Sequence, residues 1–202
     1  MPQRDAPSSS LRQNIAALAA RLVAEDGITD YGLAKRKAAR QLGVTHGEAM
    51  PNNAEIDAEL RAYVALYRDE EDDERLEIMR ETAVTLMRVL APWRPALTGA
   101  VLDGSATGFA EVELDLFADS AKDVEIFLLG KGIQYEHREI RHRGPESPEA
   151  ILIFDWEEVP IKLCVFDLIA ERSPRRNGAE RARLPAVEAL LDQAHGEEET
   201  AE

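Results

Sequence analysis

The spacing of hydrophobic positions changes near residue 92 of this chain. Before that point, apolar residues recur every three to four positions, which is the spacing of amphipathic helices. After it, several short runs alternate between apolar and polar residues, as strands with one buried face do. Pro92 and Pro95 lie at the change and end the last helical segment. The predicted helical segments lie roughly at 11–25, 30–43, 53–67 and 75–91.

Helical segments followed by strand segments indicate an α+β fold. We expect a helical region over residues 11–92, followed by a core over residues 96–194 that holds a mixed β-sheet with flanking helices. Residues 1–10 are rich in Pro and Ser, and residues 195–202 are mostly Glu and small residues, so we expect both ends to be disordered.

The predicted sheet region contains several recognisable elements. Ser120 is a suitable N-cap for a helix, and residues 133–143 are a polar strand candidate. Residues 151–156 and 159–166 read as two strands of a hairpin with Glu157 and Glu158 at its turn.

The stretch from residue 97 to residue 117 carries the candidate chemistry. Its apolar beginning, residues 97–102, predicts a strand, and Gly104 and Ser105 follow. Residues 111–117 alternate strictly, so Glu111, Glu113 and Asp115 share one face of a strand. Carboxylates spaced by two residues lie ~7 Å apart along a strand and can converge on a hard cation such as Mg²⁺. A Gly-Ser turn offers backbone N–H groups and a hydroxyl to a phosphate.

This pattern resembles the polymerase-β-like nucleotidyltransferase superfamily, in which a strand and a Gly-Ser turn precede an acidic-hydrophobic-acidic strand. The resemblance implies a nucleotidyltransferase-like core in which Glu113 and Asp115 are catalytic and hold Mg²⁺ or Mn²⁺. It also implies that Gly104 and Ser105 bind phosphate groups of an NTP. Residues 28–135 look like proteobacterial proteins of unknown function, some of which are loosely labelled nucleotidyltransferase-like; that resemblance implies no reaction.

Three features depart from the superfamily pattern. Glu113 stands where Asp is usual, and the loop between the Gly-Ser pair and the acidic strand is short. A third carboxylate is expected on a later strand, but residues 159–163 carry Lys162 in that place, and Asp155 on the preceding strand could substitute only in a favourable geometry. If the later strand lies beside the acidic one, Lys162 should point toward Glu113 and Asp115 and form a salt bridge with one of them.

Three functions are compatible with the sequence. The first is metal-dependent transfer of a nucleotidyl group from an NTP to an unknown acceptor. The second is a non-catalytic nucleotidyltransferase-like fold that acts as a protein- or RNA-binding regulatory module, which Lys162 favours. The third is a structural protein that acts through its helical region, where a protein partner could bind; the acids of residues 111–115 would then be the solvated face of a half-buried strand.

Charge narrows the choice of partners. The formal net charge of −15 argues against strong nucleic-acid binding by the surface as a whole. A basic cluster at residues 35–40 could contact phosphate or RNA, or it could pair with the acidic run at residues 69–74. A segment rich in arginine, residues 171–183, could add phosphate-binding side chains, among them Arg175 and Arg176, or it could only balance surface charge.

Composition suggests a cytoplasmic protein. No apolar stretch is long enough to span a bilayer, and the first residues lack the apolar core of a signal peptide. The chain has one cysteine, Cys164, so an intramolecular disulfide is excluded, and its four histidines lack zinc-ligand spacing.

Overall fold

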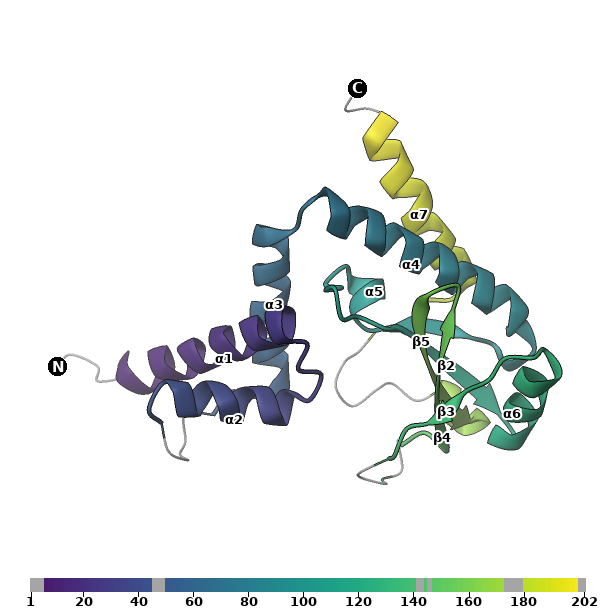
Figure 1. Cartoon of the computed structure of the whole chain (residues 1–202), viewed down its shortest axis with the longest axis horizontal. Coiled ribbons are helices and arrows are strands. Elements are labelled where there is room, and N and C mark those ends of the chain that lie inside the picture. The colour runs from purple at the N-terminus through teal and green to yellow at the C-terminus, as the bar shows by residue number, and fades with distance from the viewer. Residues whose placement is uncertain (1–5, 45–49, 141–143, 145–146, 173–179, 200–202) are drawn as a thin grey trace. The chain divides into compact units, whose positions relative to one another are not determined.

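The structure, a computed structural model, describes residues 6–44, 50–140, 144, 147–172 and 180–199 (Figure 1). Its contacts divide the chain into two compact units. The N-terminal unit comprises the described residues up to Asp72 together with residues 105–109, and the C-terminal unit comprises the described residues of 73–104 and 110–199. Because the second unit combines helices with a mixed sheet, the α+β prediction is confirmed.

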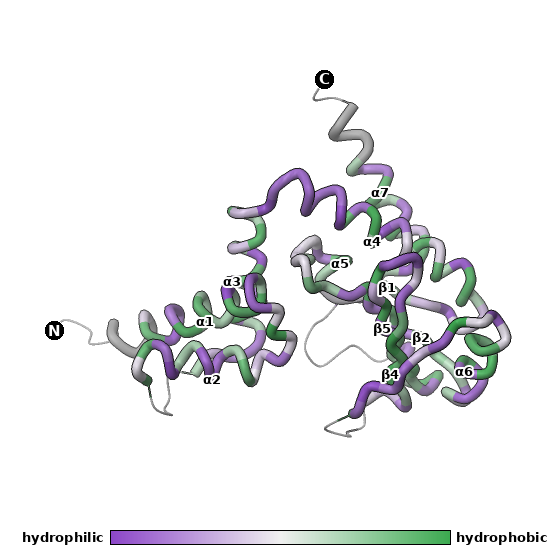
Figure 2. Tube along the Cα trace, viewed as in Figure 1, coloured by the Kyte–Doolittle hydropathy of each residue, from purple (hydrophilic) through white to green (hydrophobic). Residues whose placement is uncertain are grey.

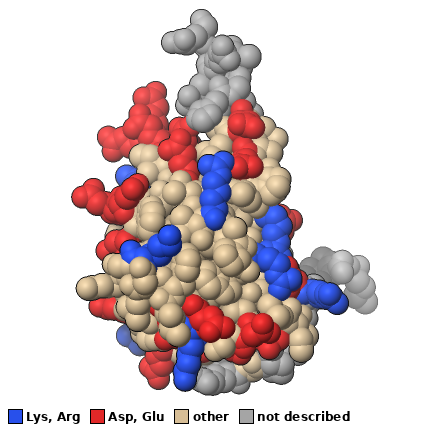
Figure 3. Space-filling view, turned by 90° about the vertical axis from the view of Figure 1, so that its right-hand side faces the viewer, with Lys and Arg blue, Asp and Glu red and all other residues tan. Residues whose placement is uncertain are grey.

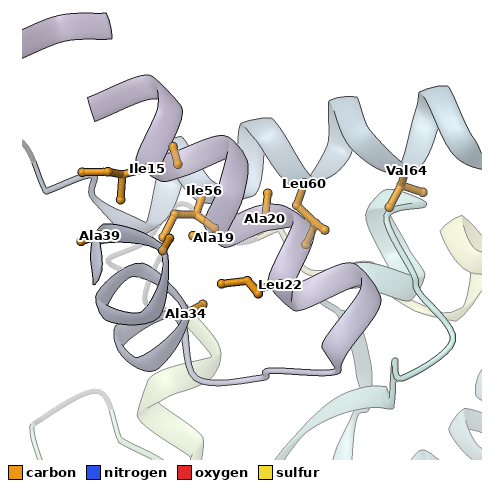
Figure 4. Close-up of a cluster of buried hydrophobic side chains, with 11 residues drawn as sticks. Ile15, Ala19, Ala20, Leu22, Ala34, Ala39, Ile56, Leu60 and Val64 are labelled. Carbon is orange, nitrogen blue, oxygen red and sulfur yellow. The ribbon is translucent and has the colours of Figure 1, made fainter. Parts of the chain in front are cut away.

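The N-terminal unit packs three helices around small apolar side chains (Figure 4). These helices are α1 (Ala6–Asp26), α2 (Tyr31–Gln41) and α3 (Asn53–Tyr67), and α1 contacts both of the others. Six buried alanines and the fully buried Ile15 and Ile56 belong to this cluster. Alanine side chains allow helix axes to approach closely, so three helices can pack into a tight apolar core here.

Local signals in the sequence set the helix boundaries of this unit. The side chain of Asp30 accepts a hydrogen bond from the backbone N–H of Leu33 and caps α2. Asn52 and Glu55 form a reciprocal capping box at the start of α3. Gly27 turns the chain after α1 with φ of 66°, and a Cβ there would lie 2.8 Å from the ring of Phe109. This close contact explains how the segment at residues 105–109 joins the N-terminal unit.

The C-terminal unit is built on a five-stranded mixed sheet in the order β1-β2-β5-β4-β3. β2 and β5 are parallel, and the other neighbouring pairs are antiparallel. The predicted hairpin is confirmed, since Trp156 pairs with Val159 across the turn. The strands are β1 (Ala96–Thr98), β2 (Val112–Ala118), β3 (Glu136–His137), β4 (Ala150–Trp156) and β5 (Val159–Asp167).

The two faces of this sheet differ in character. One face carries Leu114, Leu163 and Leu152, which lie opposite one another on β2, β5 and β4 and are fully buried. The helix α6 (Ala121–Gly130) packs against β2 and β5, and the helix α7 (Leu184–Glu199) packs against β1.

The other face of the sheet holds a small apolar cluster of Ala96, Phe117, Cys164 and Phe166. By strand parity, Glu113, Asp115 and Lys162 share this second face. The sheet therefore presents its charged residues on the side opposite its leucine layer.

Both chain ends are more helical than the sequence predicted. α1 begins at Ala6, within the segment expected to be disordered, and α7 continues to Glu199, beyond residue 194. Pro7 is tolerated because it lies in the first turn of α1, and glutamates at the end of α7 are good helix formers; each extension continues a helix that is already nucleated.

The apolar run at residues 97–102 is not one strand, so that expectation is wrong. β1 ends at Thr98, and residues Ala100–Asp103 form the short helix α5. Gly99 separates the two with φ of 74°, a conformation that interrupts an extended chain. Similarly, only Glu136–His137 of the polar candidate at residues 133–143 is a strand among the residues described there.

The boundary between units also lies earlier than the prolines at residues 92 and 95. The helix α4 (Glu70–Val89) has its residues from Asp73 onward in the C-terminal unit. Its Arg80 donates a hydrogen bond from Nε to the carbonyl oxygen of Val101 in α5, 3.2 Å away. No helix in the described part of the chain is long and apolar enough to cross a membrane.

Candidate functional site

The candidate site is a row of three ion pairs along one side of β2. Glu111 pairs with Arg138, Glu113 with Lys162, and Asp115 with Arg181. We call these three contacts the ion-pair row. Each acid that the sequence singled out thus meets a basic side chain of the same unit.

The pair of Glu113 and Lys162 follows directly from strand register. The two residues lie opposite each other on the parallel strands β2 and β5, and Lys162 Nζ lies 2.9 Å from Glu113 Oε2. The predicted salt bridge between Lys162 and one carboxylate is therefore confirmed. Burial alone lowers the pKa of the Lys162 ammonium, but the charge of Glu113 and its hydrogen bond outweigh this effect and raise that pKa.

The pair of Asp115 and Arg181 is the most deeply buried of the three. Asp115 is fully buried, and Arg181 Nε lies 2.8 Å from its Oδ2. Arg181 also donates to the carbonyl oxygen of Ala170 at 3.1 Å. Its guanidinium carbon lies 5.0 Å from the ring centre of Phe117 and 5.5 Å from that of Phe166. Arg181 is thus held by a carboxylate, a carbonyl group and two aromatic faces.

The pair of Glu111 and Arg138 has fork-to-fork geometry. Arg138 donates from Nη1 to Glu111 Oε2 at 2.8 Å and from Nη2 to Oε1 at 2.6 Å. These hydrogen bonds raise the pKa of Arg138 above its ordinary value. The backbone N–H of Arg138 also donates to the carbonyl oxygen of Ile151 in β4, which fixes Arg138 at the sheet.

A second charged cluster lies around Glu171. Its carboxylate pairs with Arg183 at 2.7 Å and also with Arg94. The guanidinium carbon of Arg183 lies 5.3 Å from the ring centre of Phe117, which Arg181 also contacts. Within the arginine-rich segment, the described residues Arg181 and Arg183 therefore stabilise the fold.

The other predicted site residues lie in different surroundings. Gly104 ends α5 in a left-handed conformation, with φ of 79°. Ser105 is buried and belongs to the N-terminal unit, whereas Gly104 and the acidic strand belong to the C-terminal unit. Arg175 and Arg176 lie outside the described residues. Phosphate binding by these four residues remains a prediction.

The glycine that does adjoin the acids is Gly99. A Cβ at this position would lie 3.3 Å from Cδ of Glu113. Thr98, the preceding residue, pairs with Glu113 across β1 and β2, and its buried hydroxyl finds no hydrogen-bond partner among the described residues. Gly99, at the start of α5, is therefore a glycine that lies directly beside the acidic strand.

The residues of the ion-pair row fit a divalent metal poorly as they are arranged. Mg²⁺ takes oxygen ligands, and its affinity depends on carboxylate charge that no other cation neutralises. Here an ammonium and a guanidinium already contact Glu113 and Asp115. Asp155, the possible substitute ligand, is exposed and lies opposite Pro160. Among the described residues, no group of three or more His, Cys, Asp or Glu side chains is placed to hold a metal.

Comparison with known proteins adds no relative: no family model, no curated protein and no solved structure matches this chain. The geometry of the chain's own side chains therefore carries the functional argument.

Sequence reasoning found Lys162 but missed the roles of Arg138 and Arg181. Alternation along residues 159–166, together with the strand order that the resemblance implies, placed Lys162 on the acidic face. Arg181 reaches Asp115 because Ala182 forms a bridge with Leu97 at the edge of the sheet, and this contact joins distant parts of the sequence. The abundance of arginine in that segment was the available signal, and it did not distinguish one arginine from another.

We predict that Arg181→Met lowers the free energy of unfolding of the C-terminal unit by about 3–5 kcal/mol, because it leaves Asp115 buried without its cation. Urea denaturation followed by tryptophan fluorescence measures this, since both tryptophans, Trp93 and Trp156, lie in that unit. Arg172→Met, at an exposed arginine, is the control and should change stability by less than about 0.5 kcal/mol. Equal effects of the two substitutions would contradict a structural role for the Arg181 pair.

We also predict that the contribution of Lys162 to stability disappears in alkali. Because folding raises the pKa of Lys162, the contribution is complete below the unfolded-state pKa of about 10.4 and is lost as pH rises through the folded-state value. Lys162→Met should cost on the order of 1 kcal/mol at pH 7–9 and progressively less above pH 10.4. Denaturation of both proteins across this range measures the difference. A difference that is constant to pH 12 would show that Lys162 acts through packing alone.

Proposed function

We propose that this chain is a non-catalytic nucleotidyltransferase-like protein that acts by binding a partner. The observation that carries the proposal is the engagement of both candidate catalytic carboxylates by cations of the chain itself, Glu113 by Lys162 and Asp115 by Arg181. A metal-dependent nucleotidyltransferase requires these carboxylates to be available to metal ions that also contact the substrate phosphates.

The sheet topology supports the resemblance on which this proposal rests. β5, which carries Lys162 in the position of the expected third carboxylate, lies directly beside the acidic strand β2. The lysine therefore replaces a negative charge with a positive one at the point where the superfamily pattern would complete its metal site. Two carboxylates with two adjacent cations have no net charge to attract Mg²⁺.

The surface charge favours a protein partner over RNA. On the face drawn in Figure 3, basic side chains are dispersed among acidic ones. RNA binding depends on basic side chains that gather along one face, and the chain as a whole has a net charge of −15.

The test is calorimetric titration of Mg²⁺ and Mn²⁺ into three proteins: the wild type, Lys162→Asp and Lys162→Met. We expect weak or no binding by the wild type and at least about tenfold tighter binding by Lys162→Asp, which removes a cation and adds a ligand. Lys162→Met is the matched control, because it removes the cation without adding a ligand, and its affinity should lie between the other two. Incubation of the wild type with labelled NTPs should give neither pyrophosphate release nor label transfer.

Two results would overturn the proposal. Tight Mn²⁺ binding by the wild type that is lost in Asp115→Asn, together with pyrophosphate release, would establish the catalytic alternative. Absence of metal binding by all three proteins would remove the nucleotidyltransferase-like site and leave Lys162 as an element of fold stability.

A further inference from the structure

The N-terminal unit has a groove between α1 and α3 beside its core. It is an open groove with a volume of about 610 Å³, and all its lining residues belong to this unit. Leu18 of α1 and Ala62, Tyr63, Leu66 and Tyr67 of α3 supply its apolar surface. The spacing on α3 is that of a helix face, and such a face normally packs against another element.

The apolar side chains of the groove are unusually exposed. Leu66 is 73% exposed and Tyr67 63%, which are the highest values among the large hydrophobic residues described in this unit. The rings of Tyr63 and Tyr67 lie 4.6 Å apart and form one continuous apolar surface. Exposed apolar surface of this kind, next to polar residues, is typical of a protein-binding site.

The wall of the groove is held in position by a hydrogen-bonded network. The hydroxyl of Tyr63 donates to Glu25 Oε1 at 2.6 Å, and Arg21 Nε lies 2.9 Å from the same carboxylate. The hydrogen bonds from Tyr63 and Arg21 lower the pKa of Glu25, and the hydrogen bond to Glu25 raises the pKa of Tyr63. The Tyr63 ring is therefore fixed before any partner arrives, which reduces the entropy lost on binding.

The charge around the groove is negative at one end. Arg21 is already paired with Glu25, and the remaining charged lining residue, Glu59, lies toward the other end of the groove, about two helical turns before Tyr67. Beyond the end of α3, residues 69–72 are all acidic, and the C-terminal end of a helix adds a partial negative charge. Figure 2 shows this hydrophilic run at the start of α4.

We infer that the groove binds an amphipathic helix of another protein, with apolar residues along one face and a cluster of Lys or Arg at one end. The apolar face would cover Leu66 and Tyr67, and the basic end would meet residues 69–72, which follow Tyr67 at the end of α3. A second copy of this chain fits less well, because its groove has the same negative charge. This inference rests on the proposed function in one respect: both hold that the chain acts by binding a partner.

The test uses three synthetic 18-residue helical peptides labelled with a fluorophore. The first has leucine and alanine on one face and four lysines at its C-terminal end, the second replaces the lysines with glutamates, and the third replaces the leucines with serines. Fluorescence anisotropy at physiological salt should show at least about tenfold tighter binding of the first peptide than of either other peptide.

Variants of the protein locate the binding surface. Leu66→Ser and Tyr67→Ser should each weaken binding of the lysine peptide at least about tenfold, because both side chains are exposed in the free protein and buried in the complex. Leu33→Ser, on α2, is the matched control and should bind as the wild type does, since Leu33 is 48% exposed but does not line the groove. Glu70→Gln combined with Glu71→Gln should weaken binding of the lysine peptide and reduce its advantage over the glutamate peptide, because both acids are exposed in the acidic run after α3. Circular dichroism confirms that each variant is folded.

Several outcomes would overturn the inference. These are no binding of the lysine peptide, equal binding by Leu66→Ser and the wild type, or equal binding of the lysine and glutamate peptides. A wild-type dimer in sedimentation equilibrium that Leu66→Ser converts to a monomer would assign the groove to a second copy instead. Peptide binding does not involve Lys162 or Asp115, so failure of this test and failure of the metal titration are separate results.

Discussion

The C-terminal unit depends on the contact between Arg181 and the buried carboxylate of Asp115. A charge with no solvent exposure is costly unless a counter-ion and hydrogen bonds accompany it. Arg181 provides the counter-ion, and the rings of Phe117 and Phe166 enclose its guanidinium group. This contact joins β2 to the chain just before α7, so it ties the charged face of the sheet to the segment that leads into the C-terminal helix.

Under the proposal of a non-catalytic protein, the same contact makes the acidic strand a structural element of the sheet. Glu111, Glu113 and Asp115 alternate along the strand as metal ligands would, and they also alternate as partners for cations on neighbouring elements. The register between β2 and β5 decides between metal binding and ion pairing. β5 places a lysine, where a metal site would need a further carboxylate, directly opposite Glu113.

The sequence predicted those features that depend on local periodicity and adjacent strands. The helical region follows from apolar residues every three to four positions, and the sheet region and the hairpin that contains β5 follow from alternation along short segments. The pairing of Lys162 follows from alternation together with the strand order that the resemblance implies. The break at Gly99 was missed because apolar residues on both sides of it conceal a change of backbone conformation. The partner of Asp115 could not be chosen, because it depends on an edge contact between Leu97 and Ala182.

The most direct test of this account is NMR observation of the Arg181 Nε–H and Lys162 Nζ–H₃ signals during addition of Mn²⁺. A paramagnetic ion broadens the signals of nuclei near it, so the two side chains report whether a metal reaches Glu113 and Asp115. The account predicts that both signals are present in the free protein and keep their line widths at Mn²⁺ concentrations that broaden exposed acidic sites such as residues 69–72. Selective broadening or loss of the Arg181 and Lys162 signals at low Mn²⁺ would contradict it, because the metal would then displace the cations that the fold supplies.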